Sequence, residues 1–359
     1  MSIEVQKKVN RTVSLGVHNT AERNNSLDFL RIVAMGMIIS MHYLGHGGIE
    51  RAGVEYSSYC GAWLIKSFVS VGVNCYVLIT GYFLIRSTSF SLRKVFNLWS
   101  AVFVYSIGFY LLFFLLGDVA WSWKEFIKVM LPVKGNAYWF ATMYIGLYLL
   151  HPYLNRMIIG VDKVEARKLL YCLIFLFSIY SFVGDTYQTH SGFSVVWFIV
   201  LYFIGAYIRL FGIMRAKFPI YICLYIAMCV CMFISFFIFS KVLAVDGDDY
   251  QVLSALYKYN SPINLLASTS LFLAFARMEI SSKNLCKWIQ FFAPLTFGIY
   301  LIHDNIFVRE HLWHQWLQTQ MYYDSGYFLF HWMGSVIAIF LVCAFIEWGR
   351  KKITVFLFL

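Results

Sequence analysis

The chain has 359 residues, of which 60% are hydrophobic, 20% aromatic and only 13% charged, and its mean hydropathy is +0.68. These values exclude an ordinary soluble globular protein and indicate an integral membrane protein. The formal net charge of +11 comes from basic residues spread over many short segments. Such a distribution suits anionic lipid headgroups of a bilayer better than a groove for nucleic acid, so no nucleic-acid partner is expected.

The chain begins with a polar, basic segment, residues 1–25, that contains no apolar core. A secretory signal peptide needs such a core, so we expect a cytoplasmic N-terminal tail instead. Residues 26–348 are expected to form one transmembrane domain, and residues 349–359 a cytoplasmic C-terminal tail.

Apolar segments long enough to cross a bilayer recur along the transmembrane domain. They predict an all-α, polytopic membrane protein with a bundle of about ten transmembrane helices. The segments are Leu27–Leu44, Ala62–Ile85, Val95–Leu116, Tyr138–Tyr153, Leu169–Val183, Val195–Leu210, Ile220–Phe239, Pro262–Ala276, Trp288–Asn305 and Tyr327–Glu347.

The distribution of lysine and arginine gives the orientation of this bundle. If alternate connections face the cytoplasm, 20 basic residues lie inside and seven outside, while Arg31 and Lys66 fall within spans. This asymmetry satisfies the positive-inside rule. It predicts a multi-pass protein of the cell membrane with both termini in the cytoplasm.

The first span carries two polar side chains on one stripe. In LDFLRIVAMGMIISMHYLGH, eleven helical steps bring His42 to within about 20° of Arg31, roughly 16 Å further along the axis. A guanidinium inside a bilayer is costly and normally faces a bundle interior or a watery cavity. We therefore expect this helix to line a pocket.

Simpler explanations exist for the same residues. Ser26 can cap the helix, and Asp28, three residues before Arg31, can form a salt bridge that merely neutralises it. His42 could be only an interhelical hydrogen-bonding residue. His46 would complete an HxxxH metal pair, but the sequence offers no third ligand, so no metal is expected.

Two later segments carry further candidate residues. The second span ends in TGYFLIR, which places Arg86 at the inner surface, although any cytoplasmic flank would favour a basic residue there. The ninth span contains GIYLIH, which places His303 about 22 Å from its cytoplasmic end. His42 and His303 are then both in the outer half of the membrane. Between residues 118 and 136, WSWKEFIKVMLP predicts an amphipathic helix that lies in the interface.

The placement of arginines at the inner surface and histidines in the outer half of the membrane indicates a group-transfer reaction. Two arginines at the inner surface, Arg31 and Arg86, can bind phosphates through paired donors, and a desolvated histidine can take a proton from a hydroxyl. An anionic carrier at the inner end and a hydroxyl further out are the substrates of a transferase. No GxSxG elbow, Walker loop or GxGxxG turn follows a strand, so hydrolase, NTPase and dinucleotide sites have no support.

The arginine and histidine separated by ten residues and preceded by LDFLR, together with TGYFLIR and GIYLIH, resemble the acyltransferase 3 family of membrane O-acyltransferases. The resemblance covers Ser26 to about Trp348. It implies a ten-span helical bundle, acetyl-CoA as cytoplasmic donor, and a sugar of a surface glycan or its precursor as acceptor.

By the same resemblance, His42 would be the catalytic histidine and Arg31 the essential arginine of the pocket. Arg86 matches the arginine after the family's SGF-like stretch, where Thr80 stands in place of the common serine. Tyr300 and His303 belong to a stretch that resembles the family's YLxH ending and would support the site.

Several alternatives stay open at this point. A transporter or flippase of a glycan or anionic solute could also hold buried arginine and histidine in a polar path. The sequence does not identify the acceptor hydroxyl, nor does it separate acetyl from succinyl. Direct transfer and an acyl-histidine intermediate are both consistent with it, and so is a homo-oligomer.

Overall fold

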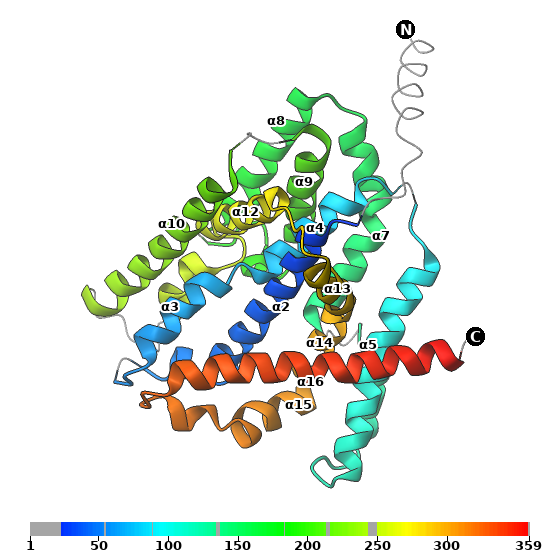
Figure 1. The fold of residues 1–359 in the computed structure, drawn as a ribbon, viewed down its shortest axis with the longest axis vertical. Coiled ribbons are helices and arrows are strands. Elements are labelled where there is room, and N and C mark those ends of the chain that lie inside the picture. Colours follow the sequence, from blue (N-terminus) through cyan, green and yellow to red (C-terminus); the bar gives the residue numbers. More distant parts are fainter. Residues whose placement is uncertain are drawn as a thin grey trace.

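The computed structural model describes residues 23–53, 55–87, 89–133, 137–182, 184–212, 216–242 and 250–357. Within these ranges every regular element is a helix, so the expectation of an all-α protein is confirmed. Helix α2 (Asn25–Gly45) lies near the middle of the bundle, and α16 (Phe328–Leu357) runs across one side of it (Figure 1). Residues 1–22 of the expected N-terminal tail lie outside the described residues.

A helix occupies each of the ten predicted apolar segments. They are α2, α3 (Tyr59–Val69) followed by α4 (Gly72–Leu84), α5 (Leu92–Leu115), α7 (Trp139–Ile159), α8 (Lys163–Ile174), α9 (Val195–Phe211), α10 (Phe218–Phe237), α12 (Pro262–Arg277), α13 (Lys283–Phe292) followed by α14 (Thr296–His303), and α16. Within the described ranges, six spans are long and apolar enough to cross a membrane: α2, α3–α4, α5, α10, α13–α14 and α16. The protein is therefore a helical membrane protein, while the count of about ten crossings stays a prediction.

Helix α2 begins with a side-chain cap that differs from the expected one. The side chain of Asn24 accepts a hydrogen bond from the Leu27 amide at 3.0 Å, which satisfies one free donor of the first turn. The prediction that Ser26 caps the helix was wrong, because its hydroxyl donates to the Met278 carbonyl at 2.6 Å. The helix then contacts α3, α4, α12, α13, α14 and α16, which makes it the central element.

Glycines allow the second span to approach α9 closely. A Cβ at Gly81 would lie 2.2 Å from the Tyr202 carbonyl oxygen, and one at Gly205 would lie 2.3 Å from the Leu78 carbonyl oxygen. Small residues at helix contacts let backbones pack tightly where lipid provides no hydrophobic driving force. This contact fixes α4 between α2 and α9, which positions its pocket-facing side chains.

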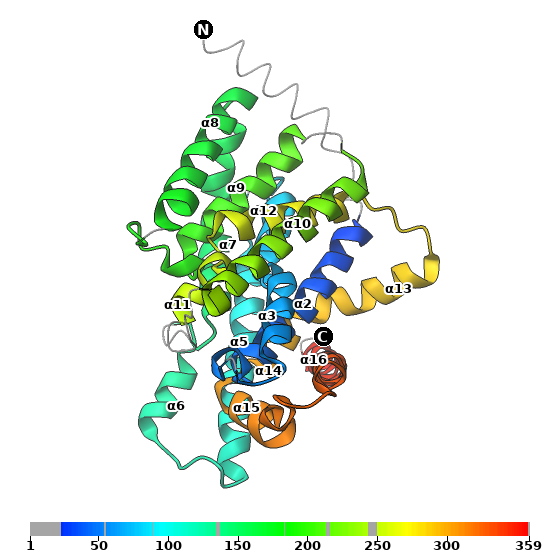
Figure 2. The ribbon, with the colours of Figure 1, turned by 90° about the vertical axis from the view of Figure 1, so that its left-hand side faces the viewer.

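Helix α16 is attached to the bundle near its C-terminal end by a buried acid. Glu347 is 2% exposed, and its carboxylate accepts hydrogen bonds from Tyr105 of α5 and from Arg350, both at 2.7 Å. Seen along its axis, α16 lies beside α14 (Figure 2). The helix continues past Trp348 to Leu357, so the described part of the expected C-terminal tail extends the same helix.

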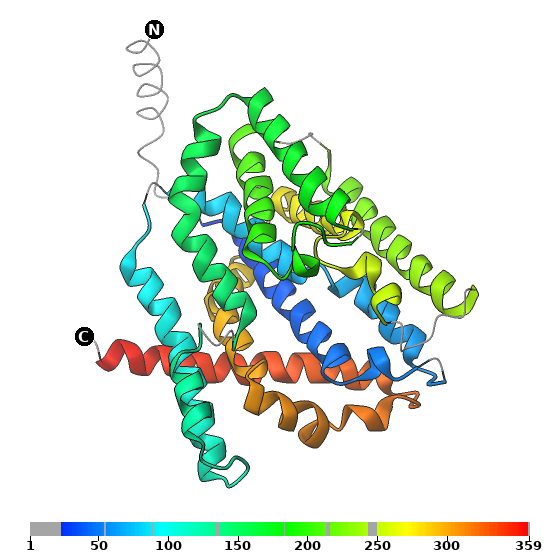
Figure 3. The same ribbon diagram turned by 180° about the vertical axis from the view of Figure 1, so that it is seen from behind.

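The amphipathic helix predicted after the third span is present as α6 (Trp123–Met130). Ser122 caps it by accepting from the Glu125 amide, and Trp123 is 68% exposed. The helix lies beside the C-terminal end of α5, away from α8 and α9, which are seen in front when the molecule is viewed from behind (Figure 3). Its place in a membrane interface stays a prediction. The other short α-helices are α11 (Tyr250–Leu253) and α15 (Ile306–Glu310).

Candidate active site

His42 and His303, which are 261 residues apart in the sequence, form a hydrogen-bonded pair. Nδ1 of His42 on α2 lies 2.9 Å from Nε2 of His303, the last residue of α14. His303 is fully buried, while the side chain of His42 is 18% exposed. The two predicted histidines are therefore brought together.

The partners of this pair decide which nitrogen of His42 carries a proton. Nδ1 of His303 lies 2.6 Å from the Ile299 carbonyl oxygen, which only accepts, so Nδ1 of His303 carries the hydrogen. In the neutral ring, Nε2 of His303 is then an acceptor, and it takes the hydrogen bond from Nδ1 of His42. Nε2 of His42 keeps its lone pair, and no described residue makes a hydrogen bond to it. His42 is thus prepared to accept a proton at Nε2.

Asp304 adds a buried negative charge to the pair. Its Oδ1 lies 3.8 Å from Nδ1 of His42, 3.2 Å from Nε2 of His46 and 3.0 Å from Nη2 of Arg309. The Arg309 guanidinium and the His46 ring both contact this oxygen, and a cation so close favours the charged form of the carboxyl. The carboxylate is therefore ionised and would stabilise a positive charge on His42. The sequence reasoning missed Asp304, although its place directly after His303 was a usable signal.

The same residues could hold a metal ion. The ligand atoms of His42, His46 and Asp304 lie within 4.8 Å of one another, which supplies the third ligand that the sequence lacked. In this arrangement, however, Oδ1 of Asp304 is paired with Arg309, and Nδ1 of His42 is bonded to His303. A metal bound through Oδ1 of Asp304 and Nδ1 of His42 would compete with both contacts, and in this structure these atoms form a hydrogen-bonded acid–base cluster.

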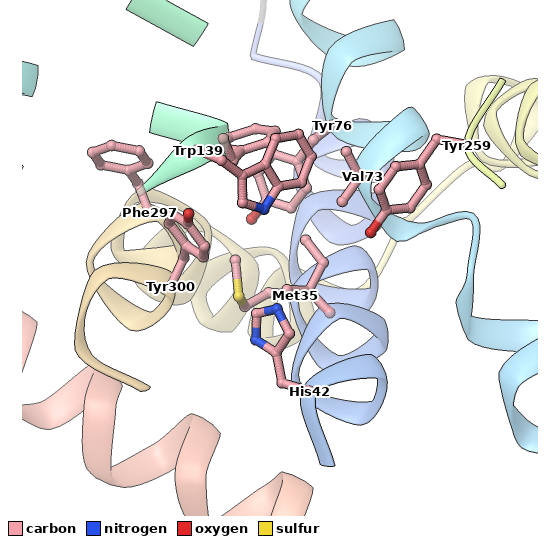
Figure 4. A pocket seen from close by; sticks show the side chains of 10 residues that line it. Met35, His42, Val73, Tyr76, Trp139, Tyr259, Phe297 and Tyr300 are labelled. Atoms are coloured by element: carbon pink, nitrogen blue, oxygen red, sulfur yellow. The ribbon is translucent and has the colours of Figure 1, made fainter. Parts of the chain in front are cut away.

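A small buried pocket adjoins His42. Its other lining residues come mainly from α2, α4, α7 and α14 and are mostly apolar or aromatic: Met35, Ile38, Val73, Tyr76, Trp139, Phe140, Tyr259, Phe297 and Tyr300. The His42 ring points from α2 into the space between these side chains (Figure 4). The hydroxyls of Tyr76 and Tyr300 are buried without a hydrogen-bond partner among the described residues. Tyr300, predicted as a supporting residue, thus belongs to the same pocket as His42.

Arg31 lies near the N-terminal end of α2, where its guanidinium is paired with a carboxylate but stays partly exposed. It forms the expected salt bridge with Asp28, whose carboxylate also accepts from Arg23 at 2.6 Å, and its guanidinium lies 5.3 Å from the centre of the Phe83 ring. Its side chain remains 31% exposed. Asp28 therefore neutralises Arg31 in part without burying it.

Two polar side chains connect the Arg31 end with the pocket. Tyr76, which lines the pocket, interacts electrostatically with Arg31 and lies beside Thr296. Tyr144 on α7 lies beside Thr80 and also interacts with Arg31. Thr80 itself donates to the Tyr76 carbonyl of its own helix at 2.9 Å. Predicted residues Arg31 and Thr80 are thus close to the pocket through these two tyrosines.

Arg86 is not brought into this cluster. It follows α4, is exposed, and forms no ion pair with any described residue. Arg209 of α9, which the sequence analysis did not single out, donates to the Tyr82 hydroxyl at 2.7 Å, and its Nε is buried without a hydrogen-bond partner among the described residues. Its position within an apolar helix was the signal that could have indicated it.

Comparison with known proteins identifies the family. The family model described as an acyltransferase domain matches residues 24–355, nearly the whole chain. No curated protein and no solved structure shows significant similarity to it. The matched range contains the His42–His303 pair, the pocket and Arg31. The chain therefore belongs to the acyltransferase 3 family and is a membrane acyltransferase.

Proposed function

We propose that the protein is an O-acetyltransferase that moves an acetyl group from cytoplasmic acetyl-CoA to a hydroxyl of a surface glycan or its lipid-linked precursor. The observation that carries this proposal is the lone pair at Nε2 of His42, fixed by the hydrogen-bond chain through His303 to the Ile299 carbonyl, next to a buried pocket. A neutral imidazole held in this tautomer is suited to take a proton from an alcohol.

In the proposed reaction, Nε2 of His42 removes the proton of the acceptor hydroxyl. At the same time the hydroxyl oxygen of the acceptor attacks the thioester carbonyl carbon of acetyl-CoA. A tetrahedral intermediate forms, the carbon–sulfur bond breaks, and the CoA thiolate takes the proton back from His42. The ionised Asp304, 3.8 Å from Nδ1, would stabilise the imidazolium between these two steps. Direct attack by Nε2, with an acetyl-histidine intermediate, would give the same products.

The donor would enter from the Arg31 end of α2. A partly exposed guanidinium beside an aromatic ring can bind phosphate oxygens and stack against a base, which suits the phosphates and adenine of CoA. Arg86, which is exposed, would supply a second contact from the surface of the inner end. This orientation requires both termini to lie in the cytoplasm and fits a bundle with ten crossings of the cell membrane.

The test uses purified protein in lipid nanodiscs with acetyl-CoA, and it measures CoA release with a thiol reagent. It also compares surface glycans of cells with and without the protein by mass spectrometry. We expect His42→Ala to lower acetyl transfer by about 10²–10⁴-fold, the usual contribution of a general base. His331→Gln is the matched control, because His331 bonds Tyr43 of the same helix at 2.8 Å but lies outside the pocket.

An active, folded His42→Ala enzyme would contradict the proposal. Movement of a glycan across the bilayer without any dependence on acetyl-CoA would support a transporter instead.

A further inference from the structure

We propose that the pocket beside His42 holds the acyl group of the donor, and that Phe140 and Val73 restrict this group to the length of an acetyl. This inference rests on the proposed function and adds the specificity of the same site. It assigns a role to two residues that the sequence did not single out.

The first argument is size. The space open to the centre of a water-sized molecule is about 20 Å³. Because this volume counts only positions of the centre, the group that fits is larger than one water, but the pocket still has room for a short acyl group only. A methyl group next to a carbonyl fits this space, and each additional methylene brings the acyl chain closer to the wall.

The second argument is that the wall is supported from behind. The Phe140 ring lies 5.7 Å from the Tyr300 ring and 6.1 Å from the Tyr76 ring, both of which line the pocket. On another side it packs 5.4 Å from Phe198, which is fully buried and does not line the pocket. Because protein interiors are close-packed, Phe140 has no free space into which it could withdraw. Val73 of α4, 5% exposed, contributes a second wall.

The third argument concerns polarity. The residues that line the pocket include no lysine or arginine, and their polar atoms are His42 and a few tyrosine and tryptophan groups. The hydroxyls of Tyr76 and Tyr300 have no hydrogen-bond partner among the described residues, so either can donate to a carbonyl oxygen in the pocket. A terminal carboxylate, as in a succinyl group, would be buried there without a cation, which is strongly unfavourable. The pocket therefore favours a short, uncharged acyl group.

The first experiment enlarges the pocket. Phe140→Leu and Phe140→Ala are assayed in nanodiscs with acetyl-CoA, propionyl-CoA and butyryl-CoA, and kcat/KM is determined for each donor. One methylene in an apolar pocket changes kcat/KM by about 10–200-fold. We expect the propionyl-to-acetyl ratio to rise at least about tenfold in the Phe140 variants. Phe236→Leu, a fully buried ring of α10 that stacks on Trp63 and does not line the pocket, is expected to keep the wild-type ratio.

The second experiment reduces the pocket and does not depend on tolerance of a smaller side chain at Phe140. Val73→Leu adds one carbon to the wall, and Val77→Leu adds one carbon to the same helix at a buried site that does not line the pocket. Binding of acetyl-CoA and of free CoA is measured by calorimetry. We expect Val73→Leu to weaken acetyl-CoA about tenfold relative to free CoA, and Val77→Leu to weaken neither selectively.

The outcomes separate the two proposals. If the wild-type protein neither binds nor hydrolyses acetyl-CoA, the proposed function fails and the acyl pocket fails with it. If acetyl transfer is observed but the donor ratios are unchanged in the Phe140 variants and in Val73→Leu, only the acyl pocket is refuted. A rise of the propionyl ratio in Phe236→Leu equal to that in Phe140→Leu would also refute it, because general loosening would then explain the change.

Discussion

Replacing Asp304 with asparagine would remove the negative charge beside the histidine pair while keeping the size and shape of the side chain. The carboxylate lies 3.8 Å from Nδ1 of His42. At this distance two unit charges attract by about 4 kcal/mol if the effective dielectric constant is about 20. Because Arg309 shares the same oxygen and proton transfer is incomplete in the transition state, we expect about half of this energy to be lost.

A loss of about 2 kcal/mol corresponds to a decrease in kcat of roughly 30-fold. The assay is acetyl-CoA turnover in nanodiscs at saturating donor, with the thermal midpoint measured in parallel to show that the variant is folded. Asp118→Asn is the control, because Asp118 pairs with His311 at 3.7 Å outside the pocket. A folded Asp304→Asn protein with kcat within twofold of wild type would refute the electrostatic role.

Three further predictions concern the same site and the anchor of α16. His303→Leu removes the acceptor that fixes the His42 tautomer. We expect kcat to fall about 10²-fold while the KM for acetyl-CoA stays nearly constant. A parallel change in KM would show instead that His303 binds the donor. Arg31→Ala should raise the dissociation constant of CoA, measured by calorimetry, about tenfold, and Arg31→Lys should restore part of the affinity. An unchanged dissociation constant in Arg31→Ala would exclude a phosphate contact. Glu347→Gln should lower the free energy of unfolding by about 3 kcal/mol, because a buried ion pair is broken, with little effect on kcat of the folded fraction. Thermal unfolding in detergent measures this, and an unchanged midpoint would contradict it.

The fold class and the site residues of the first helix, Arg31 and His42, could be predicted from local patterns in the sequence. Ten apolar stretches predicted ten helices, and a helix lies at each of them. The spacing of Arg31 and His42 placed both on one stripe of the first helix, and Asp28 was correctly expected to pair with Arg31. These inferences succeed because helical periodicity and the cost of burying charge in lipid act on residues that are neighbours in sequence.

The tertiary structure decided which distant residues share the site. The bond between His42 and His303, the proximity of Asp304 and the aromatic wall with Phe140 depend on how α2, α7 and α14 pack. Packing also left Arg86 exposed, although its motif predicted a role beside Arg31. The sequence by itself determined the membrane helices and the residue types at the centre, because hydrophobicity and spacing are local properties. The proton position on His42 and the shape of the pocket depend on contacts between helices, and no local pattern contains them.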